Sequence, residues 1–356
     1  MDNIQHYSRF INIDGVSCYM ISILHILQQI PSFVDVIINN NIKINKNTVI
    51  YELRRAIKTS ISNNNITITL KSFKKIIGNI NFIWINLQHQ DSQEFFNFLI
   101  SKIDEELKQQ ITYIPIIKNN NININISHKT TILQIIALNY IQRIEQNNYS
   151  PITNLFVGYF ISNIKCSLCS TISPSFESFI SLSLSIPFEK NDINKEYTLE
   201  ECFSNFIANE TLDKFNKLTC DLCGIKNQPI KNIKIWKAPK ILVIHLKRFI
   251  TNKYGINSKK RSNNIIYPIN NFNIYNYYHY HSPYKNNTLY TLIGINIHIS
   301  FGHNSINVGH YISLVKNIYN NKWLLFDDAN PIIEITNESI IQNKNAYLLF
   351  YLKNEL

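Results

Sequence analysis

Two stretches within the first 110 residues place apolar side chains at helical spacing. Between Cys18 and Ile30 the apolar residues lie three or four positions apart, and Pro31 follows, a residue typical of a helix end. From about Asp91 to Leu107 the apolar positions recur every four residues, at Phe95, Leu99, Ile103 and Leu107. Each stretch therefore predicts an amphipathic helix with one buried face.

Beyond residue 155 the pattern changes to short runs of strand character. Six such runs are present: Phe179 to Ile186, Ile241 to Phe249, Tyr290 to Ile299, Tyr311 to Val315, Trp323 to Phe326 and Tyr347 to Leu352. Helices followed by strands predict an α+β fold rather than a doubly wound sheet. The Asn-rich segment 119–127 also alternates, but asparagine disfavours strands, so we expect a surface insertion there.

The composition is that of a globular chain. Of 356 residues, 45% are hydrophobic and 17% charged, which excludes a disordered or collagen-like chain. The net charge of +11 can indicate a nucleic acid or an acidic partner. The basic residues, however, are scattered singly rather than gathered into runs, so we expect no nucleic acid partner.

The sequence also bears on membrane contact and cellular compartment. Every apolar stretch is interrupted long before the ~20 residues that a membrane helix needs, and the first ten residues lack the features of a signal peptide. We therefore expect no membrane partner and an intracellular protein, cytoplasmic or nuclear. Six cysteines are too few for a disulfide scaffold, and paired cysteines in a reducing compartment more often bind metal.

Cys18 is a candidate nucleophile at the start of the first predicted helix. Gly15 can supply a tight turn before it, and Ser17 can cap the helix. In the first turn, backbone N–H groups and the helix dipole favour the thiolate, which is the reactive form. The alternative is a cysteine that only packs in the core, so a nucleophilic role requires a base nearby.

His310 and Asp327 are candidates for that base and for its orienting carboxylate. If residues 317–320 form a four-residue hairpin loop, the strands on either side bring His310 opposite Asp327. In such a pair the carboxylate fixes the imidazole tautomer, and the other ring nitrogen takes the thiol proton. A slip of one residue would favour Asp328 instead, and an ordinary polar hairpin end is the alternative to a catalytic one.

Four of the remaining cysteines form two Cys-x-x-Cys pairs. Fifty residues separate the pairs (220 − 169 − 1), which leaves room for the strands that would bring four thiolates together: Cys166, Cys169, Cys220 and Cys223. This spacing predicts one structural zinc ion. The sixth cysteine, Cys202, lies among apolar residues and is expected to pack.

These segments, taken in order, resemble the ubiquitin-specific protease family. The resemblance rests on the box around Cys18, on an acidic box at residues 90–95, on Leu155 and Phe156 followed by the first cysteine pair, and on residues 238–249, 266–268, 309–311, 323–328 and 346–351. It covers about residues 9–353. No single box is decisive, but their ordered set is specific.

The resemblance implies a single catalytic domain with a papain-like right-hand fold. A helical thumb would span about residues 9–150, zinc-ribbon fingers about 155–235, and an antiparallel β palm about 236–353, with finger and palm strands interleaved. It further implies that ubiquitin is the partner and that the Cys18 thiolate attacks the carbonyl of its terminal glycine. His310 would then protonate the departing amine while Asp327 orients the imidazole, and metal would take no part in the chemistry.

Four further residues are expected to contact the substrate. In the family the acidic box faces the basic C-terminal tail of ubiquitin, which implicates Asp91 and Glu94. Their spacing equally fits a capping box, and both roles are compatible if Asp91 projects into the channel while Glu94 caps. Gly309 would let the Gly-Gly end of the substrate approach closely, with Tyr311 beside it.

The first box departs from the family at the oxyanion position. Five residues before Cys18, where the family usually has an asparagine, this chain has Ile13, and Asn12 lies one position upstream. A one-residue bulge would carry Asn12 into the oxyanion hole, or backbone N–H groups would serve alone. Because losing one donor costs ~10²–10³ in turnover, one alternative to an active deubiquitinase is a weak or inactive ubiquitin-binding protein. The net positive charge leaves a second alternative, a zinc-ribbon nucleic-acid binder.

Overall fold

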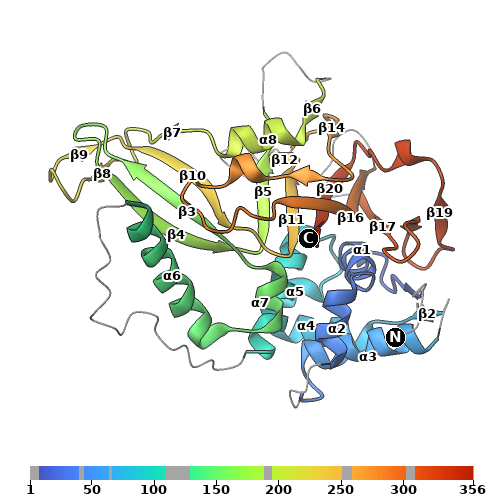
Figure 1. The fold of residues 1–356 in the computed structure, drawn as a ribbon. Coiled ribbons are helices and arrows are strands. Elements are labelled where there is room, and N and C mark those ends of the chain that lie inside the picture. Colours follow the sequence, from blue (N-terminus) through green and yellow to red (C-terminus); the bar gives the residue numbers. More distant parts are fainter. Residues whose placement is uncertain are drawn as a thin grey trace.

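A computed structural model describes residues 8–39, 44–63, 66–108, 129–187, 195–250, 259–301 and 309–355. The Asn-rich segment 119–127 lies outside these ranges. Helices gather at the N-terminal side and strands follow (Figure 1), so the predicted α+β fold is confirmed.

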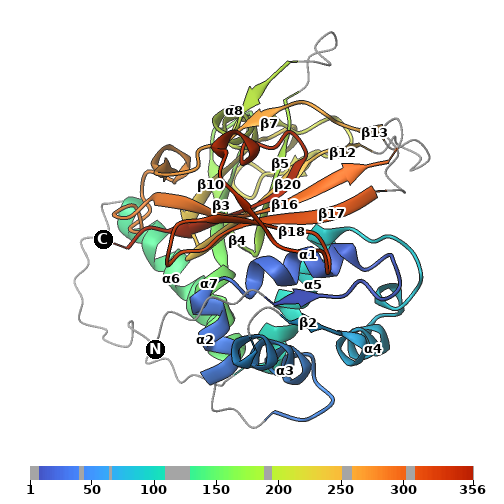
Figure 2. The ribbon, with the colours of Figure 1, turned by 90° about the vertical axis from the view of Figure 1, so that its right-hand side faces the viewer.

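The thumb consists of short helices that pack against the large sheet. They are α1 (Cys18–Leu27), α2 (Pro31–Asn39), α3 (Val49–Ser62), α4 (Lys71–Ile80), α5 (Ser92–Glu106) and α7 (Pro151–Phe156), with the 3-10 turn η1 (Phe82–Trp84) and the small pair β1 (Arg9–Phe10) and β2 (Thr67–Ile68). The predicted second helix agrees with α5 to within one residue at each end. All ten residues of α1 are buried, and Figure 2 shows this helix beneath β17 (Gly309–Lys316) and β18 (Trp323–Phe326).

The prediction that Pro31 ends the first helix is wrong. α1 already ends at Leu27, and Pro31 is the first residue of α2, a position that suits proline because its missing N–H would have no helical partner. Within the described residues no single helix is long and apolar enough to span a bilayer; α1 and α2 pass that test only as a pair bent by 93°.

The palm is an eight-stranded sheet at the centre of the molecule. Its order is β19 (Ile333–Ile335), β18, β17, β16 (Leu289–Ser300), β20 (Ala346–Lys353), β11 (Ile241–Lys247) and β5 (Ser181–Ser185), with β15 (Phe272–Asn273) added to β16. The expected antiparallel pairing holds except at the edge, where β5 runs parallel to β11. A parallel edge strand is possible because the finger strands intervene between the palm strands in sequence.

The fingers form a second, four-stranded antiparallel sheet. Its order is β4 (Ile172–Phe179), β3 (Gly158–Lys165), β10 (Ile230–Lys237) and β7 (Glu210–Thr211), and the hairpin of β8 (Leu218–Thr219) and β9 (Lys226–Asn227) lies at the outer end (Figure 1). The helix α6 (Lys129–Asn148), in the range expected for the thumb, packs on β4 instead.

The remaining elements border the palm. They are β6 (Tyr197–Thr198), which pairs with β14 (Ile265–Ile266), α8 (Leu199–Phe206), the pair β12 (Phe249–Ile250) and β13 (Lys259–Lys260), and the 3-10 turns η2 (Tyr275–Tyr277) and η3 (Glu338–Ile340). Cys202 on α8 is fully buried in an apolar cluster, as expected for a packing residue.

The palm sheet separates two apolar cores. Alternate side chains of a strand point to opposite faces, so Val243 packs under the thumb helices while Leu242 and Ile244 pack on the other side with α8. A buried polar bridge fixes the thumb to the palm: Asn296 on β16 accepts a hydrogen bond from Ser92 on α5 (2.7 Å) and donates one to Ser22 on α1 (2.8 Å). This bridge holds the second turn of α1 against β16.

Candidate active site

Cys18 is the first residue of α1 and is 1% exposed. Gly15 adopts φ 73°, the left-handed conformation that favours glycine, and turns the chain into the helix as predicted. Ser17 occupies the N-cap position but makes no side-chain cap, contrary to expectation. Its hydroxyl donates to Asp14 instead (3.0 Å), so this side chain leaves the backbone N–H groups at the start of α1 uncapped.

His310 and Asp327 lie next to each other and next to Cys18. The Nε2 atom of His310 is 2.6 Å from Oδ1 of Asp327, and the imidazole also hydrogen-bonds with the Cys18 thiol. Since Nε2 faces the carboxylate, Nδ1 is the ring nitrogen left for the thiol. The nucleophile, base and orienting carboxylate predicted from the sequence are therefore brought together.

The predicted hairpin register is wrong by two residues. Lys316 pairs with Trp323 rather than with Asn321, so six residues (317–322) separate the two strands instead of four. A shift of two preserves which face each side chain occupies, whereas a shift of one would reverse it. For this reason Asp327 still reaches His310.

The hydrogen bonds with Cys18 and Asp327 also change the pKa of His310. The hydrogen bond with Cys18 is the largest influence and, together with Asp327, it outweighs the opposing effect of burial and raises the pKa of His310 to about 9. The imidazole is thus held in its protonated form across the neutral range, which is the form that can donate a proton to a leaving group.

Asn12 and Asp328 complete this cluster. Nδ2 of Asn12 donates to Oδ2 of Asp328 (2.9 Å), while its Oδ1 accepts the N–H of Ser17 (3.0 Å). The ring nitrogens of His310 and the carboxylate oxygens of Asp327 and Asp328 offer atoms that lie within 4.8 Å of one another. Asn12 therefore lies beside the triad of Cys18, His310 and Asp327 despite its shifted place in the sequence. One hydrogen of its amide remains for a further acceptor.

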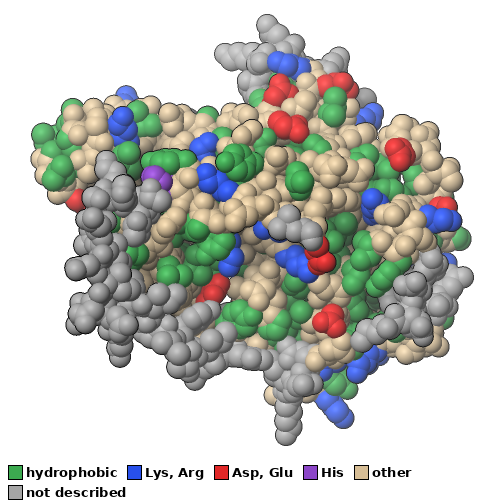
Figure 3. Space-filling model, viewed as in Figure 1, with side chains coloured by type: hydrophobic (Ala, Val, Ile, Leu, Met, Phe, Trp, Pro, Cys, Tyr) green, Lys and Arg blue, Asp and Glu red, His purple; other side chains and the backbone are tan. Residues whose placement is uncertain are grey.

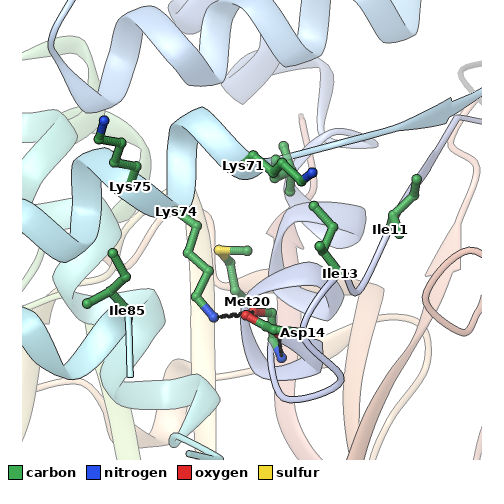
Figure 4. A pocket seen from close by; sticks show the side chains of 10 residues that line it. Ile11, Ile13, Asp14, Met20, Lys71, Lys74, Lys75 and Ile85 are labelled. Atoms are coloured by element: carbon green, nitrogen blue, oxygen red, sulfur yellow. Dashed lines mark hydrogen bonds and ion pairs between the residues drawn. The ribbon is translucent and has the colours of Figure 1, made fainter. Parts of the chain in front are cut away.

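A second set of contacts fixes the loop before Cys18. Asp14 accepts the backbone N–H groups of Val16 (3.1 Å) and Ser17 (3.0 Å) and forms an ion pair with Lys74 of α4 (Figure 4). Lys74 also donates to the hydroxyl of Ser17 (2.8 Å). Burial acts to raise the pKa of Asp14, but the hydrogen bonds from Lys74, Ser17 and Val16 hold it below its usual value.

The family model for ubiquitin carboxyl-terminal hydrolase matches residues 10–351. The chain belongs to this family. Ubiquitin carboxyl-terminal hydrolase Usp2 of Drosophila melanogaster is 26% identical over 341 residues, which are 95% of this chain and 34% of that protein. Ubiquitin carboxyl-terminal hydrolase 4 of Arabidopsis thaliana is 28% identical over 334 residues, 92% of this chain and 85% of the relative.

The fold has a counterpart among solved structures. The SAGA Ubp8/Sgf11/Sus1/Sgf73 DUB module bound to ubiquitin aldehyde matches with a TM-score of 0.71 and 26% identity, covering all of this chain and 71% of that one. The resemblance found in the sequence and the implied right-hand fold are thereby confirmed. The chain spans about a third of the length of the Drosophila relative.

In the acidic box the cap of α5 is Asp91, whereas the sequence left room for Glu94 in that role. Asp91 is the N-cap of α5 and accepts the N–H groups of Gln93 (2.6 Å) and Glu94 (3.2 Å), while the hydroxyl of Tyr347 donates to its other oxygen. Glu94 is exposed and makes no cap. Burial raises the pKa of both carboxyl groups, and the charge of Asp91 adds to the rise at Glu94.

Gly309 and Tyr311 are both buried in β17. A Cβ atom on Gly309 would lie 2.3 Å from Nε2 of His298, so this position needs glycine for packing. Tyr311 is buried, stacks near His298 (ring centroids 4.6 Å apart) and Tyr347, and meets Ser92. Their contact with a substrate stays a prediction. His245 and His298 are buried, as expected for packing residues, and His303 lies outside the described residues.

The four predicted metal ligands meet at the end of the fingers. Their sulfur atoms lie within 4.8 Å of one another, with 3.9 Å between Cys166 and Cys223 and 3.6 Å between Cys169 and Cys220. Zinc in a tetrahedron of thiolates has Zn–S distances near 2.3 Å and hence S–S distances of about 3.8 Å. The donor set therefore fits a metal ion of this kind.

Each cysteine pair sits in the same tight turn. The residue after the second cysteine is left-handed in both, Ser170 at φ 60° and Gly224 at φ 69°, and its N–H donates to the carbonyl of the first cysteine, Cys166 or Cys220. This turn points both thiols of a pair to one side.

Three residues of the candidate site were not predicted from the sequence: Asp14, Lys74 and Tyr347. Lys74 carries no motif that would distinguish it from other helix-surface lysines. Asp14 offered a signal, because an acidic residue three positions before a helix start often accepts backbone N–H groups. Tyr347 contacts Asp91 because of its position on β20. The sequence predicts only that it belongs to a strand.

Proposed function

We propose that this chain is a cysteine-type deubiquitinase that hydrolyses the bond after the C-terminal glycine of ubiquitin. The observation that carries the proposal is the hydrogen-bonded series Cys18, His310 and Asp327 in a chain of the ubiquitin carboxyl-terminal hydrolase family. A relative of known structure is bound to ubiquitin aldehyde, which supports ubiquitin as the partner.

The residues support a two-step reaction. The Cys18 thiolate adds to the glycine carbonyl, and His310 gives its proton to the departing amine, which leaves a thioester on Cys18. His310 then takes a proton from water as the hydroxide attacks the thioester, and the thiolate is restored. Asp327 holds the imidazole in position throughout.

Asn12 is the proposed side-chain donor for the oxyanion. Its amide is fixed at both ends, by Ser17 N–H and by Asp328, so the remaining N–H is oriented before the negative charge develops. The backbone N–H groups of the first turn of α1 supply further donors. This arrangement favours catalysis over a binding protein that merely retains the fold.

Glu94 is the proposed contact for the basic tail of ubiquitin. It is the exposed member of the acidic box, whereas both oxygens of Asp91 are engaged within the chain. The metal that we propose at Cys166, Cys169, Cys220 and Cys223 is zinc, which would cross-link the two turns at the fingertip and has no role in the reaction. Six free cysteines also suit an intracellular location.

Labelling by ubiquitin with a C-terminal electrophile tests the proposal. Wild-type protein should form a covalent adduct and hydrolyse a ubiquitin–fluorophore, and Cys18→Ala should do neither while still binding ubiquitin. Cys202→Ala is the matched control, because that thiol is buried away from the site. Ubiquitin binding without labelling would instead identify a non-catalytic binder, and salt-sensitive DNA binding without ubiquitin binding would favour the nucleic-acid class.

The distribution of charge bears on that last class. On the face drawn in Figure 3, Lys and Arg lie singly among apolar and polar side chains and form no continuous stripe. Phosphate backbones are bound by clusters of such residues, so the surface gives this alternative no support.

A further inference from the structure

A pocket of about 380 Å³ lies behind the loop that leads to Cys18. Ile11 and Ile13 form one wall and Ile85 the other, with Met20 between them (Figure 4). Lysines of α4 border it: Lys71, Lys74 and Lys75. It is thus an apolar pocket with a basic border.

The pocket and the reacting groups lie on opposite sides of one extended segment. Ile11 N–H donates to the carbonyl of Ile68 (3.0 Å), which fixes the segment beside β2. Beyond that point the side chains alternate: Ile11 and Ile13 line the pocket, whereas Asn12 between them turns to Asp328. A molecule in the pocket would therefore contact the back of the oxyanion loop without touching the triad.

Large apolar side chains near Ile85 in the sequence are exposed as well. Ile13 is 46% exposed, and along η1 and the residues after it Phe82 is 74% and Leu87 75% exposed. Large apolar side chains that are grouped and exposed mark an interaction surface more often than isolated ones do. Lys71 lies on the Ile13 side of the pocket and Lys75 on the Ile85 side (Figure 4), so an occupant that meets both is extended.

The charge of the border points to an acidic occupant. Asp14 is the acidic residue among the lining side chains, and it is already paired with Lys74. Lys71 and Lys75 are exposed, and within the described part of the chain neither forms an ion pair. Residues four apart lie on the same side of a helix, so these two ammonium groups can meet carboxylates on one peptide.

We propose that this pocket binds an extended acidic protein segment that places one large apolar side chain between carboxylates. The apolar side chain fills the space between Ile13 and Ile85, and the carboxylates pair with Lys71 and Lys75. Because Ser17 also lines the pocket, the segment binds one residue away from the nucleophile. The next step rests on the proposed function: the segment belongs to the protein from which ubiquitin is removed.

Binding of two fluorescent hexapeptides tests the proposal directly. One has the sequence Glu-Asp-Phe-Leu-Asp-Glu, and the other replaces its four acidic residues by lysine. We expect the acidic peptide to bind the wild-type chain and the basic one not to bind. The double variant Lys71→Glu with Lys75→Glu should weaken the acidic peptide at least ten-fold.

The control variant carries the same change in net charge elsewhere. Lys58 on α3 and Lys108 after α5 are exposed and do not line the pocket, so Lys58→Glu with Lys108→Glu should bind the peptide like wild type. Equal losses in both variants, equal binding of both peptides, or no binding of the acidic peptide would each overturn the proposal. Binding of dodecanoate without binding of the acidic peptide would also overturn it and would assign the pocket to a lipid carboxylate.

A kinetic measurement tests the link to the reaction. Ubiquitin joined to the acidic peptide through an added lysine is compared with ubiquitin–fluorophore, which lacks the segment. The ratio of the two kcat/KM values should fall at least ten-fold in the Lys71→Glu, Lys75→Glu variant and stay constant in the control. An unchanged ratio overturns the assignment to the acceptor, whereas failure of the wild type on both substrates would contradict the proposed function itself.

Discussion

Asn12 donates a hydrogen bond of 2.9 Å to Asp328, a residue 316 positions later in the chain. The contact joins the loop before the nucleophile to the turn that follows the carboxylate of the triad. Asp328 adopts φ 46°, a left-handed conformation that costs a residue with a side chain about 1–2 kcal/mol. Burial raises the pKa of its carboxyl group, against the effect of the hydrogen bond from Asn12. The carboxylate thus stays in an unfavourable position where it can hold the amide.

Replacing either partner should slow turnover without removing the nucleophile. Asn12→Ala removes the oxyanion donor, for which a loss of ~10²–10³ in kcat is expected. Asp328→Gly removes the carboxylate but suits the left-handed backbone, so activity should fall while the midpoint of thermal unfolding stays constant or rises. Steady-state hydrolysis of ubiquitin–fluorophore and electrophile labelling measure both effects. Wild-type kcat in Asn12→Ala would exclude this residue from the oxyanion hole.

The residues that carry chemistry were largely predictable from the sequence because each has a local signature. Cys18 follows a glycine turn at a helix start, the cysteine pairs have ligand spacing, and His310 and Asp327 flank a hairpin. The hairpin loop was predicted two residues too short, but a two-residue shift preserves facing. The prediction that Asp327 is the partner of His310 therefore held although the predicted loop length was wrong.

What could not be predicted depends on tertiary contacts. Lys74 reaches Asp14 because α4 packs behind the nucleophile loop, and no periodicity reports the packing of one helix against a loop. The cap of α5 shows the same limit: the spacing of Asp91 and Glu94 permits a capping box, but the Tyr347 hydroxyl and burial decide that Asp91 alone caps. α6 was missed because its apolar face covers the edge of the fingers.

The reaction should show an alkaline limit set by His310. Hydrogen bonding with Cys18, aided by Asp327, raises the pKa of His310 to about 9. In the proposed reaction the imidazolium is the acid that protonates the leaving amine, so kcat/KM should decline as pH rises through about 9. Asp327→Asn weakens the support for the charged form and should move this limit to lower pH. Coincident profiles for wild type and Asp327→Asn would contradict the assigned pair.

The same shift predicts how stability changes with pH. A histidine whose folded pKa lies above its unfolded value of about 6.5 stabilises the fold fully below that pH and loses the contribution as pH rises toward 9. The free energy of unfolding of wild type relative to His310→Ala should therefore fall between pH 6.5 and 9. Denaturant titrations at intervals of one pH unit measure this difference, and a constant difference would contradict the shift.

Lys74 should act as a positioning residue for the nucleophile loop. The side chains of Lys74 and Asp14 are only 13% and 17% exposed. Lys74→Met therefore removes one donor each from the mostly buried carboxylate of Asp14 and from the hydroxyl of Ser17. We expect a loss of about 1–3 kcal/mol in the free energy of unfolding and a lower kcat with little change in KM. Lys74→Arg should restore part of kcat, and Lys58→Met is the control on α3. A rise in KM alone would assign Lys74 to substrate binding.

The two Cys-x-x-Cys turns should respond oppositely to changes at their left-handed residue. Ser170 and Gly224 occupy equivalent positions, but only Gly224 adopts φ > 0 without steric cost. Ser170→Gly should stabilise its turn by roughly 1 kcal/mol, and Gly224→Ala should destabilise the other by about 1–2 kcal/mol. Nothing lies within 4 Å of a Cβ at Gly224, so the cost there arises from the backbone alone. The rate of zinc transfer to a chelator reports on the turns directly: it should fall in Ser170→Gly and rise in Gly224→Ala. Rates that change in the same direction in both variants would contradict the equivalence of the two turns.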